Sequence, residues 1–404
     1  MRLNILFLTV GEIERIDKKG IYNDLIRELA GRGHGVYAVL PSERRRKGKT
    51  RLTEEGLVHL LAVKTWNITK TSPVEKVIST LTIEKKYEKA IKKFFIGVKF
   101  DLVLYATPPI TFSKLIKKIK KRDDARSYLM LKDIFPQNAA DLGMIKENGF
   151  VWRMFRKKEI ELYRVSDRIG CMSPANMEFL LEHNEYIEPA IVGLCPNAIE
   201  VRKFTGHKID YELREKHGIP RDKVVFMYGG NLGRPQGIDF LIKALDSVKE
   251  LDNVFMLIMG SGTDKGKIID FIDSVKPENI KFMQAVSPEE YQKILCSCDA
   301  GMIFLDYRFK IPNFPSRLLS YLEAGIPVLT ATDPNTDVGK IIEDAGAGTA
   351  LLSNDAAAFR DAVIRLAGDG DLRKQMGING RNLMEENYLV KHAADAIEGR
   401  YSHV

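Results

Sequence analysis

The chain has 404 residues, a hydrophobic fraction of 45%, a charged fraction of 29% and a formal net charge of +8. This length exceeds one ordinary hydrophobic core, so we expect two domains of a globular protein. No apolar run approaches the roughly 20 residues of a membrane-spanning helix. The apolar N-terminus lacks a small-residue cleavage site, and we interpret it as a first strand and not a signal peptide.

The charge is unevenly distributed along the chain. Residues 1–200 carry 36 Lys and Arg against 25 Asp and Glu, a charge of +11, which leaves −3 for the remainder. The densest basic clusters lie at residues 44–47, 85–93 and 114–122. A basic half beside a near-neutral half indicates contact with a large anionic surface, either lipid or nucleic acid. An ordinary solvated basic surface is the alternative, with about equal weight.

The first 40 residues predict one βαβ unit. Residues 3–10 and 36–40 are continuously apolar strands, and residues 21–31 form an amphipathic helix between them. Such strands are typical of a parallel sheet that is covered on both faces. The loop at residues 11–20 ends in Gly20 but is not a G-x-G-x-x-G loop, so it does not indicate a redox dinucleotide. We interpret His34 as structural.

Further strands and helices follow in the first half. A helix is expected at about 74–95, strands at 101–105 and 128–131, and a carboxylate, Asp133, follows the second of these strands. The carboxyl end of a parallel strand is where α/β sheets bind ligands, although a turn or helix-capping Asp is equally possible. Aromatic and basic residues alternate at helical spacing in 149–164, which fits a helix lying on anionic lipid as well as a core-facing helix with a basic exposed side.

A linker at about 198–208 leads to a second domain. Its strands are expected at residues 224–228, 254–262, 280–284 and 300–305, and two helices at about 355–402 end the chain. The first of these strands runs into the glycine-rich loop 229–237, which contains Arg234. Glycines permit a close approach of the backbone, and the arginine fork suits phosphate.

Residues 313–329 predict a loop, a short helix and a buried strand. Pro315 and Ser316 suit a helix start, and Gly325 suits its end. Arg317 lies in the first turn, where free backbone N–H groups favour an anion, and Glu323 lies near the other end. The pair could hold a diphosphate and a ribose, or be an ordinary surface Arg and Glu. The four cysteines are scattered and indicate a reducing cytoplasm, and Cys296 and Cys298 lack the spacing of a metal pair.

Two segments together resemble a known family. Pro-Ser-Arg at 315–317 with Ala-Gly-Ile-Pro-Val at 324–328, and Gly-Asn-Leu-Gly-Arg-Pro-Gln-Gly at 230–237, are similar to the donor site of retaining, GT-B-fold glycosyltransferases of family 4. They resemble more narrowly the branch that transfers N-acetylated amino sugars in bacterial surface-polysaccharide assembly. Glu323 matches the second glutamate of the family signature, and Pro315 stands in place of the first.

The resemblance implies an α/β GT-B architecture of two Rossmann-like parallel-sheet domains. Residues 1–200 would bind the acceptor, residues 201–384 the nucleotide sugar, and a C-terminal helix at about 385–404 would pack back onto the first domain. It implies catalytic roles for Arg234, Arg317 and Asp133. The donor would be held by the residues that match the family's donor positions, namely Gly20, Gly230, Asn231, Val286, Pro315, Ser316, Leu318 and Glu323.

The implied reaction is a metal-independent transfer with retention. The expected donor is a UDP-linked N-acetylated hexosamine or deoxyhexosamine, and the expected acceptor is a lipid-linked saccharide. No cofactor and no metal is expected, and the protein would be cytoplasmic and peripheral at the inner face of the cell membrane. A mannosyl- or glucosyltransferase that uses GDP or another nucleotide is the alternative. A nucleic-acid-binding protein is the alternative of another class, and the chain lacks the compact modules of such proteins.

Overall fold

The computed structural model describes residues 2–11, 13, 15–46, 48–68, 71, 73–201, 203 and 206–399. The chain forms two compact units, Met1–Glu200 with Leu389–Val404, and Val201–Tyr388. The expected division at residue 200 coincides with this boundary. The second unit ends at Tyr388, four residues beyond the expected 384, and the chain then returns to the first unit. Residues 202, 204 and 205 of the expected linker, and residues 400–404 of the expected last helix, lie outside the described residues.

The first unit is built on an eight-stranded sheet with the order β3-β4-β2-β1-β5-β6-β7-β8. Every neighbouring pair is parallel except β3 with β4, which is antiparallel. The strands are β1 (Asn4–Leu8), β2 (Gly35–Glu43), β3 (Arg51–Glu55), β4 (Val58–Thr65), β5 (Leu102–Ala106), β6 (Arg126–Leu131), β7 (Arg168–Cys171) and β8 (Val192–Leu194).

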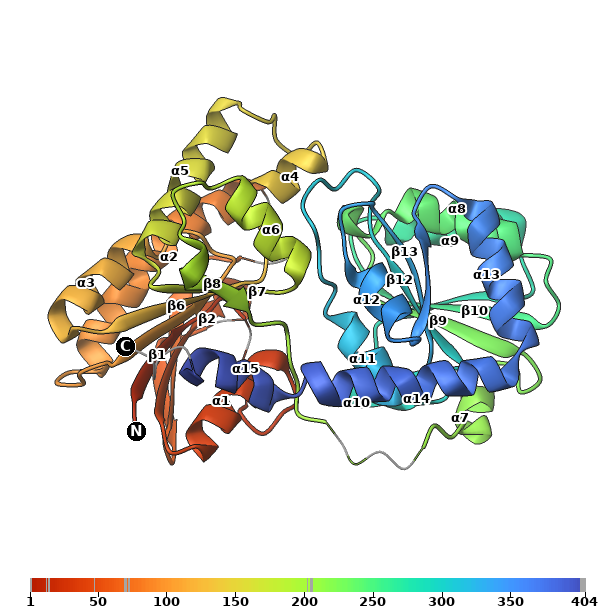
Figure 1. Ribbon diagram of the computed structural model, residues 1–404, viewed down its shortest axis with the longest axis horizontal. Coiled ribbons are helices and arrows are strands. Elements are labelled where there is room, and N and C mark those ends of the chain that lie inside the picture. Colours follow the sequence, from red (N-terminus) through yellow and green to blue (C-terminus); the bar gives the residue numbers. More distant parts are fainter. Residues whose placement is uncertain are drawn as a thin grey trace. The chain divides into compact units, whose positions relative to one another are not determined.

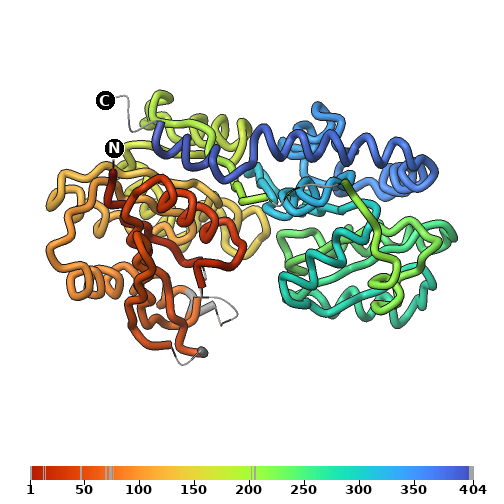
Figure 2. Tube along the Cα trace, turned by 90° about the horizontal axis from the view of Figure 1, so that it is seen from below, coloured from red at the N-terminus to blue at the C-terminus, as the bar shows by residue number. Residues whose placement is uncertain are grey.

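Helices cover both faces of this sheet. They are α1 (Ile21–Gly31), α2 (Pro73–Phe94), α3 (Ser113–Asp123), α4 (Gln137–Asp141), α5 (Phe150–Val165), α6 (Pro174–Glu182) and α15 (Val390–Gly399), with short 3₁₀ turns η1 (Arg44–Arg46) and η2 (Pro189–Ile191). The last helix, α15, packs beside the first, α1 (Figures 1 and 2). The expected structural His34, in the turn after α1, is 4% exposed, accepts a hydrogen bond from Leu3 N–H at Nδ1, and bonds Glu398 of α15 through Nε2.

The second unit has a six-stranded parallel sheet with the order β11-β10-β9-β12-β13-β14. Its strands are β9 (Val224–Asn231), β10 (Val254–Ser261), β11 (Ile280–Gln284), β12 (Ala300–Phe304), β13 (Val328–Thr332) and β14 (Gly348–Leu352). Its helices are α7 (Tyr211–Lys216), α8 (Ile238–Val248), α9 (Lys265–Val275), α10 (Pro288–Cys296), α11 (Arg317–Ala324), α12 (Val338–Asp344), α13 (Ala356–Gly368) and α14 (Gly370–Asn387), with the 3₁₀ turn η3 (Arg234–Gln236). Counted in chain order, the strands run 3-2-1-4-5-6, the order of a Rossmann fold.

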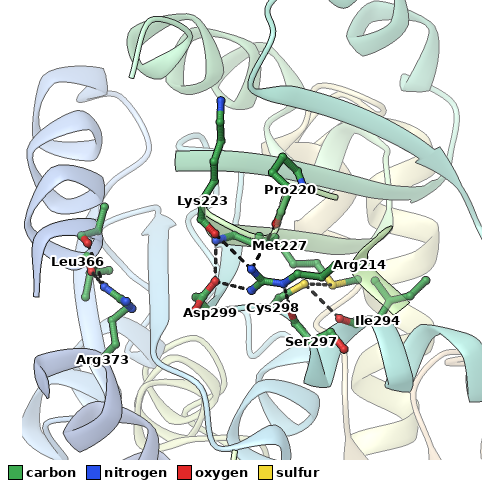
Figure 3. A network of polar contacts seen from close by, with 12 residues as sticks. Arg214, Pro220, Lys223, Met227, Ile294, Ser297, Cys298, Asp299, Leu366 and Arg373 are labelled. Carbon is green, nitrogen blue, oxygen red and sulfur yellow. Dashed lines mark hydrogen bonds and ion pairs between the residues drawn. The ribbon is translucent and has the colours of Figure 1, made fainter. Parts of the chain in front are cut away.

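Three helices, and not the expected two, end the described chain. The break between α13 and α14 lies at Asp369, whose side chain accepts a hydrogen bond from Leu372 N–H and so begins a new helix. Arg373 of α14 donates to the carbonyls of Leu366 and Ala367 at the end of α13 (Figure 3). Among the described residues, no helix is long and apolar enough to cross a membrane.

A buried ion pair joins β9 to β12 at their amino ends. Arg214 is 1% exposed and its Nη2 donates to Asp299 Oδ2 at 2.6 Å, while its other nitrogens donate to the carbonyls of Ser297, Pro220 and Lys223 (Figure 3). Asp299 also accepts from Val225 N–H at 2.8 Å and donates its own N–H to Val225 O. The guanidinium therefore replaces its lost hydration with protein oxygens, which a buried charge requires.

We expect Asp299→Ala to destabilise the protein by about 3–5 kcal/mol, because it leaves the Arg214 charge buried without its carboxylate. Urea unfolding followed by circular dichroism measures the loss. The matched control is Arg221→Ala, which removes an equally short ion pair with Glu215 of 2.6 Å whose side chains are 57% and 55% exposed. That change should cost less than about 1 kcal/mol, and equal losses for both variants would contradict the expectation.

Candidate functional site

The strand order of the second unit indicates where a ligand binds. In a doubly wound sheet the crevice lies at the carboxyl ends of the two strands where the order reverses, here β9 and β12. The loop that follows β9 and the segment that connects β12 to α11 both begin there. These are the two segments that the sequence singled out.

Tyr321 of α11 fixes this helix across the two strands. Its hydroxyl donates to Met302 O of β12 at 3.0 Å and to Met227 O of β9 at 3.3 Å. The ring occupies the space above Gly301, where a Cβ would lie only 2.4 Å from it. A larger residue at 301 would displace the ring, so this glycine fixes the position of α11 and of the arginine at its start.

The glycines of the loop admit side chains from neighbouring elements. A Cβ at Gly229 would lie 2.4 Å from the ring of Tyr291 in α10, and a Cβ at Gly230 would lie 3.2 Å from Arg317 Nη2. Gly230 and Gly237 have positive φ of 137° and 57°, which a side chain rarely adopts. The structure therefore brings Gly230 and Arg317 together, and the glycines also serve the packing of Tyr291 and Arg317.

Arg317 is the cation of this site. Its Cζ lies 4.3 Å from the ring centroid of Tyr228 in β9, a cation–π contact that orients the fork. Its Nη1 is buried and has no hydrogen-bond partner among the described residues. A buried donor without a partner costs about 1–3 kcal/mol, and an anion bound at the loop would supply the missing acceptor.

The start of α11 supplies fewer free amides than expected. The helix begins at Arg317, and its N-cap is Ser316, whose hydroxyl makes no capping hydrogen bond. Leu318 N–H donates to Pro315 O at 3.1 Å, and Leu319 N–H donates to Ser316 O at 3.2 Å. The amide of Leu318 is therefore occupied by a tight turn, whereas the amides of Ser316 and Arg317 make no backbone hydrogen bond with the described residues.

Asn231 and Gln236 pair with each other. Asn231 Nδ2 donates to Gln236 Oε1 at 2.8 Å, and Gln236 Oε1 also accepts from Gly233 N–H at 3.4 Å. These two neutral residues stand where the resemblance would put the family's Arg and Lys, and here they brace the loop. The charge of the loop is carried by Arg234 at the start of η3, whose exposed guanidinium makes no hydrogen bond or ion pair with the described residues.

Glu323 and Val286 lie at the two ends of this region. Glu323 is 6% exposed on the sixth position after Arg317, roughly 9 Å along the helix axis. Its carbonyl accepts a hydrogen bond from Arg381 of α14. Val286 lies between β11 and α10, and among the described residues its N–H and C=O make no backbone hydrogen bond.

Two expected site residues lie in the first unit. Gly20 is the N-cap of α1, with an extended φ of 167°, and its N–H donates to Asp24 Oδ1 at 3.0 Å. A Cβ there would approach only the side chain of Asn23, at 3.4 Å. Asp133 follows β6, accepts a hydrogen bond from Asn138 Nδ2 at 2.7 Å, and donates its own N–H to Thr107 Oγ1 at 3.2 Å.

Sequence reasoning missed Asp333, which follows the buried strand β13. Asp333 is 1% exposed, and its Oδ1 accepts from the N–H groups of Asn335 and Thr336, both at 2.9 Å. Asn335 Nδ2 in turn donates to Phe309 O, and Thr336 Oγ1 bonds the backbone of Asn313. Asp333 therefore positions the segment between β12 and α11. Its place at the carboxyl end of an apolar strand was the signal that could have found it.

Burial raises the pKa of the Asp333 carboxyl to about 6, against the hydrogen bonds from Asn335 and Thr336 that favour the charged form. In the unfolded chain this pKa is about 3.9. Between these values the folded state binds more protons, so this group makes stability fall as pH rises from about 4 to about 6.

We expect Asp333→Asn to remove this contribution while it keeps an acceptor for both N–H groups. Urea midpoints measured from pH 4 to pH 7 should therefore rise relative to wild type as pH increases, with the gain complete near pH 7. Asp333→Ala, which also removes the acceptor, should lose stability at every pH. A difference between Asp333→Asn and wild type that is independent of pH would contradict the raised pKa.

Comparisons with known proteins agree with this geometry. Residues 210–383, all in the second unit, match the family model of glycosyl transferases group 1. The chain is 24% identical over 297 residues to a probable glycosyltransferase, WbjE, of Pseudomonas aeruginosa, with 71% of each chain covered. It is 20% identical over 350 residues to a UDP-Gal:alpha-D-GlcNAc-diphosphoundecaprenol alpha-1,3-galactosyltransferase of Escherichia coli, with 78% of this chain and 84% of that one covered.

The fold is shared with solved structures as well. A sucrose-phosphate synthase of Thermosynechococcus elongatus superposes with a TM-score of 0.75 at 15% identity, over 98% of both chains. At that identity the likeness shows the fold, which is the expected GT-B arrangement of two parallel-sheet domains. With the family match in the second unit, the chain is a glycosyltransferase enzyme of the GT-B fold, and its second unit carries the group 1 domain.

Proposed function

We propose that the enzyme transfers a sugar from a nucleotide sugar and that the second unit binds the donor diphosphate at Arg317. The observation that carries this proposal is the buried, unpartnered Nη1 of Arg317 beside Gly230 at the carboxyl end of β9. A phosphate oxygen there would satisfy the donor, and a guanidinium binds phosphate through two parallel hydrogen bonds. The free amides of Ser316 and Arg317 point to the same kind of ligand.

The chemistry needs charge stabilisation at the leaving group. When the bond between the sugar carbon and the diphosphate oxygen breaks, negative charge develops on that oxygen. Arg317 inside the site, and Arg234 on the loop, would neutralise this charge without a metal ion. We propose that the acceptor hydroxyl attacks from the same face and that the leaving phosphate takes its proton, so that the configuration is retained. The transferred sugar then has the same anomeric configuration in the product as in the donor, and only the group bonded to its anomeric carbon changes.

The other parts of the nucleotide have candidate partners in the same unit. Glu323 is a buried carboxylate on α11 and would accept from the ribose hydroxyls. The free backbone N–H and C=O of Val286 would bond the edge of the base. Gly20 in the first unit would lie near the donor phosphates, and Asp133 would contact the donor sugar or the acceptor.

We propose a UDP-linked N-acetylated hexosamine or deoxyhexosamine as the donor. Pro315 in place of the first signature glutamate removes the carboxylate that would reach the sugar, which suits a sugar with an amide in place of a hydroxyl. The Escherichia coli relative is named for a UDP sugar, which supports uracil as the base. A GDP-linked mannose or another nucleotide hexose is the second candidate.

We propose a lipid-linked saccharide as the acceptor, in the synthesis of a cell-surface polysaccharide at the inner face of the membrane. The same relative is named for an acceptor on diphosphoundecaprenol. The first unit also exposes apolar and basic side chains together at the start of α5, where Phe150 and Val151 are 84% and 44% exposed beside the exposed Arg153 and Lys157. Such a surface suits an anionic lipid interface.

Replacement of Arg317 tests the donor site. Arg317→Ala should weaken UDP binding at least about tenfold, because a hydrogen bond to a charged group contributes about 1.5–3 kcal/mol. Arg317→Lys should recover only part of the affinity, since a lysine cannot form the fork. Isothermal titration calorimetry measures both. Arg221→Ala, which removes an exposed arginine of the same unit, should bind as wild type, and unchanged affinity in Arg317→Ala would refute the site.

A donor panel tests the nucleotide and the sugar. Thermal unfolding in the presence of UDP, GDP and ADP sugars should show the largest stabilisation with UDP-N-acetylhexosamines, since at equal concentration the ligand that binds the folded state most tightly stabilises it most. Nuclear magnetic resonance of the product should show the anomeric configuration of the donor. A preference for GDP sugars would overturn the amino-sugar proposal, and an inverted anomer would overturn retention.

A further inference from the structure

The first unit contains a cationic pocket that the proposed transfer does not use. It lies between α2 and the strand β4, and it encloses a volume of ≈ 750 Å³. Its apolar wall is formed by Val63, Ala90 and Phe94, and Trp66 contributes an indole that is 39% exposed. A volume of this order is that of a small-molecule site, not of a single ion.

Five cations surround this pocket, and no carboxylate is among its lining residues. They are Arg44 after β2, Lys64 of β4 and the α2 residues Lys86, Lys89 and Lys93. The α2 residues lie at helical spacings of three and four, so the helix presents them on one face. Arg44 and Lys86 each lie 5.4 Å from the ring centroid of Trp66, which orders both cations around the indole.

The lysines of the pocket differ from other lysines of the same helix. Lys92 forms an ion pair with Glu88 at 2.8 Å, and Lys118 of α3 forms a second ion pair with the same carboxylate. By contrast, the side chains of Lys64, Lys86, Lys89 and Lys93 make no ion pair with the described residues. Burial and the neighbouring charge of Lys64 lower the pKa of Lys86, so the cations repel one another. A bound anion would relieve this repulsion.

One buried polar atom in the wall is also unsatisfied. Thr65 lines the pocket, is 3% exposed, and its Oγ1 has no hydrogen-bond partner among the described residues. Buried hydroxyls are nearly always hydrogen-bonded in native proteins. The pocket thus combines an excess of positive charge with an aromatic surface.

We propose that this pocket binds a phosphate-bearing ligand whose apolar or ring-shaped part rests against Trp66. The lysines and Arg44 bind the phosphoryl group, and Val63, Ala90 and Phe94 receive the rest of the ligand. The volume and the apolar wall exclude inorganic phosphate as the whole ligand. The phosphoryl group belongs either to a lipid headgroup or to a water-soluble phosphate compound. The site uses no residue of the proposed donor site, so it stands whether or not that proposal holds.

Trp66 provides a direct probe. The chain has 2 tryptophans, so Trp152→Phe leaves Trp66 as the sole indole emitter. In this background the emission is recorded at low salt against inorganic pyrophosphate, phosphatidylglycerol vesicles and phosphatidylcholine vesicles. We expect emission to change with at least one of the two anionic probes and not with phosphatidylcholine. A response to both indicates that the phosphoryl group suffices, and a response to the vesicles alone indicates a lipid headgroup.

A pair of charge-matched variants separates the pocket from general surface charge. Lys86→Ala with Lys89→Ala removes two pocket cations, and Lys117→Ala with Lys121→Ala removes two exposed lysines of α3 in the same unit. The pocket variant should bind the responding probe at least about tenfold more weakly, and the control within about twofold. The proposal is overturned if neither anionic probe alters Trp66 emission, or if the two variants bind equally well. Circular dichroism establishes that both variants are folded.

Discussion

The ion pair between Arg214 and Asp299 holds the amino ends of the two strands whose carboxyl ends carry the proposed donor site. Asp299 accepts a hydrogen bond from Val225 N–H with its carboxylate and donates its own N–H to Val225 O, which joins the start of β12 to β9. Arg214 pairs with the same carboxylate and donates to nearby backbone carbonyls (Figure 3). Beside this ion pair, β12 pairs with β9 at Ala300 with Phe226 and at Gly301 with Met227. The site at Gly230 and Arg317 lies at the other, carboxyl end of β9.

Two tyrosine rings support the site from β9 and α11. Tyr321 bonds the carbonyls of Met227 and Met302, and the missing side chain at Gly301 leaves room for its ring. Tyr228 then supports the guanidinium of Arg317 from β9. An arginine held in this way loses little conformational entropy when it binds phosphate, which is the advantage of a preorganised site. The unsatisfied Nη1 is the remaining cost, and a bound anion would remove it.

Much of this fold follows from local sequence rules, and the failures have physical causes. The Ser173 hydroxyl accepts a hydrogen bond from Asn176 N–H, and Pro174 follows at the first helical position, which is the usual pattern of a helix start. The strands β3 and β4 were not foreseen, because β3 is an exposed edge strand without an apolar face. The turn that occupies the Leu318 amide, and the burial of Asp333, both depend on residues that are distant in sequence. Periodicity reports which face of an element is apolar, and says nothing about which distant partner completes a hydrogen bond.

The two proposed anion sites differ in their physical means of binding. Arg317 is a single, oriented fork in a buried position, where hydrogen-bond geometry selects the ligand and salt has little effect. The pocket beside Trp66 gathers flexible lysines at an exposed opening, where the summed field attracts any phosphoryl group and is screened by salt. A buried fork suits a donor that must be positioned to within a fraction of an ångström for reaction. A lysine-lined pocket suits a ligand that has only to be retained. The five cations of this pocket form part of the charge of +11 in residues 1–200, against −3 in the remainder.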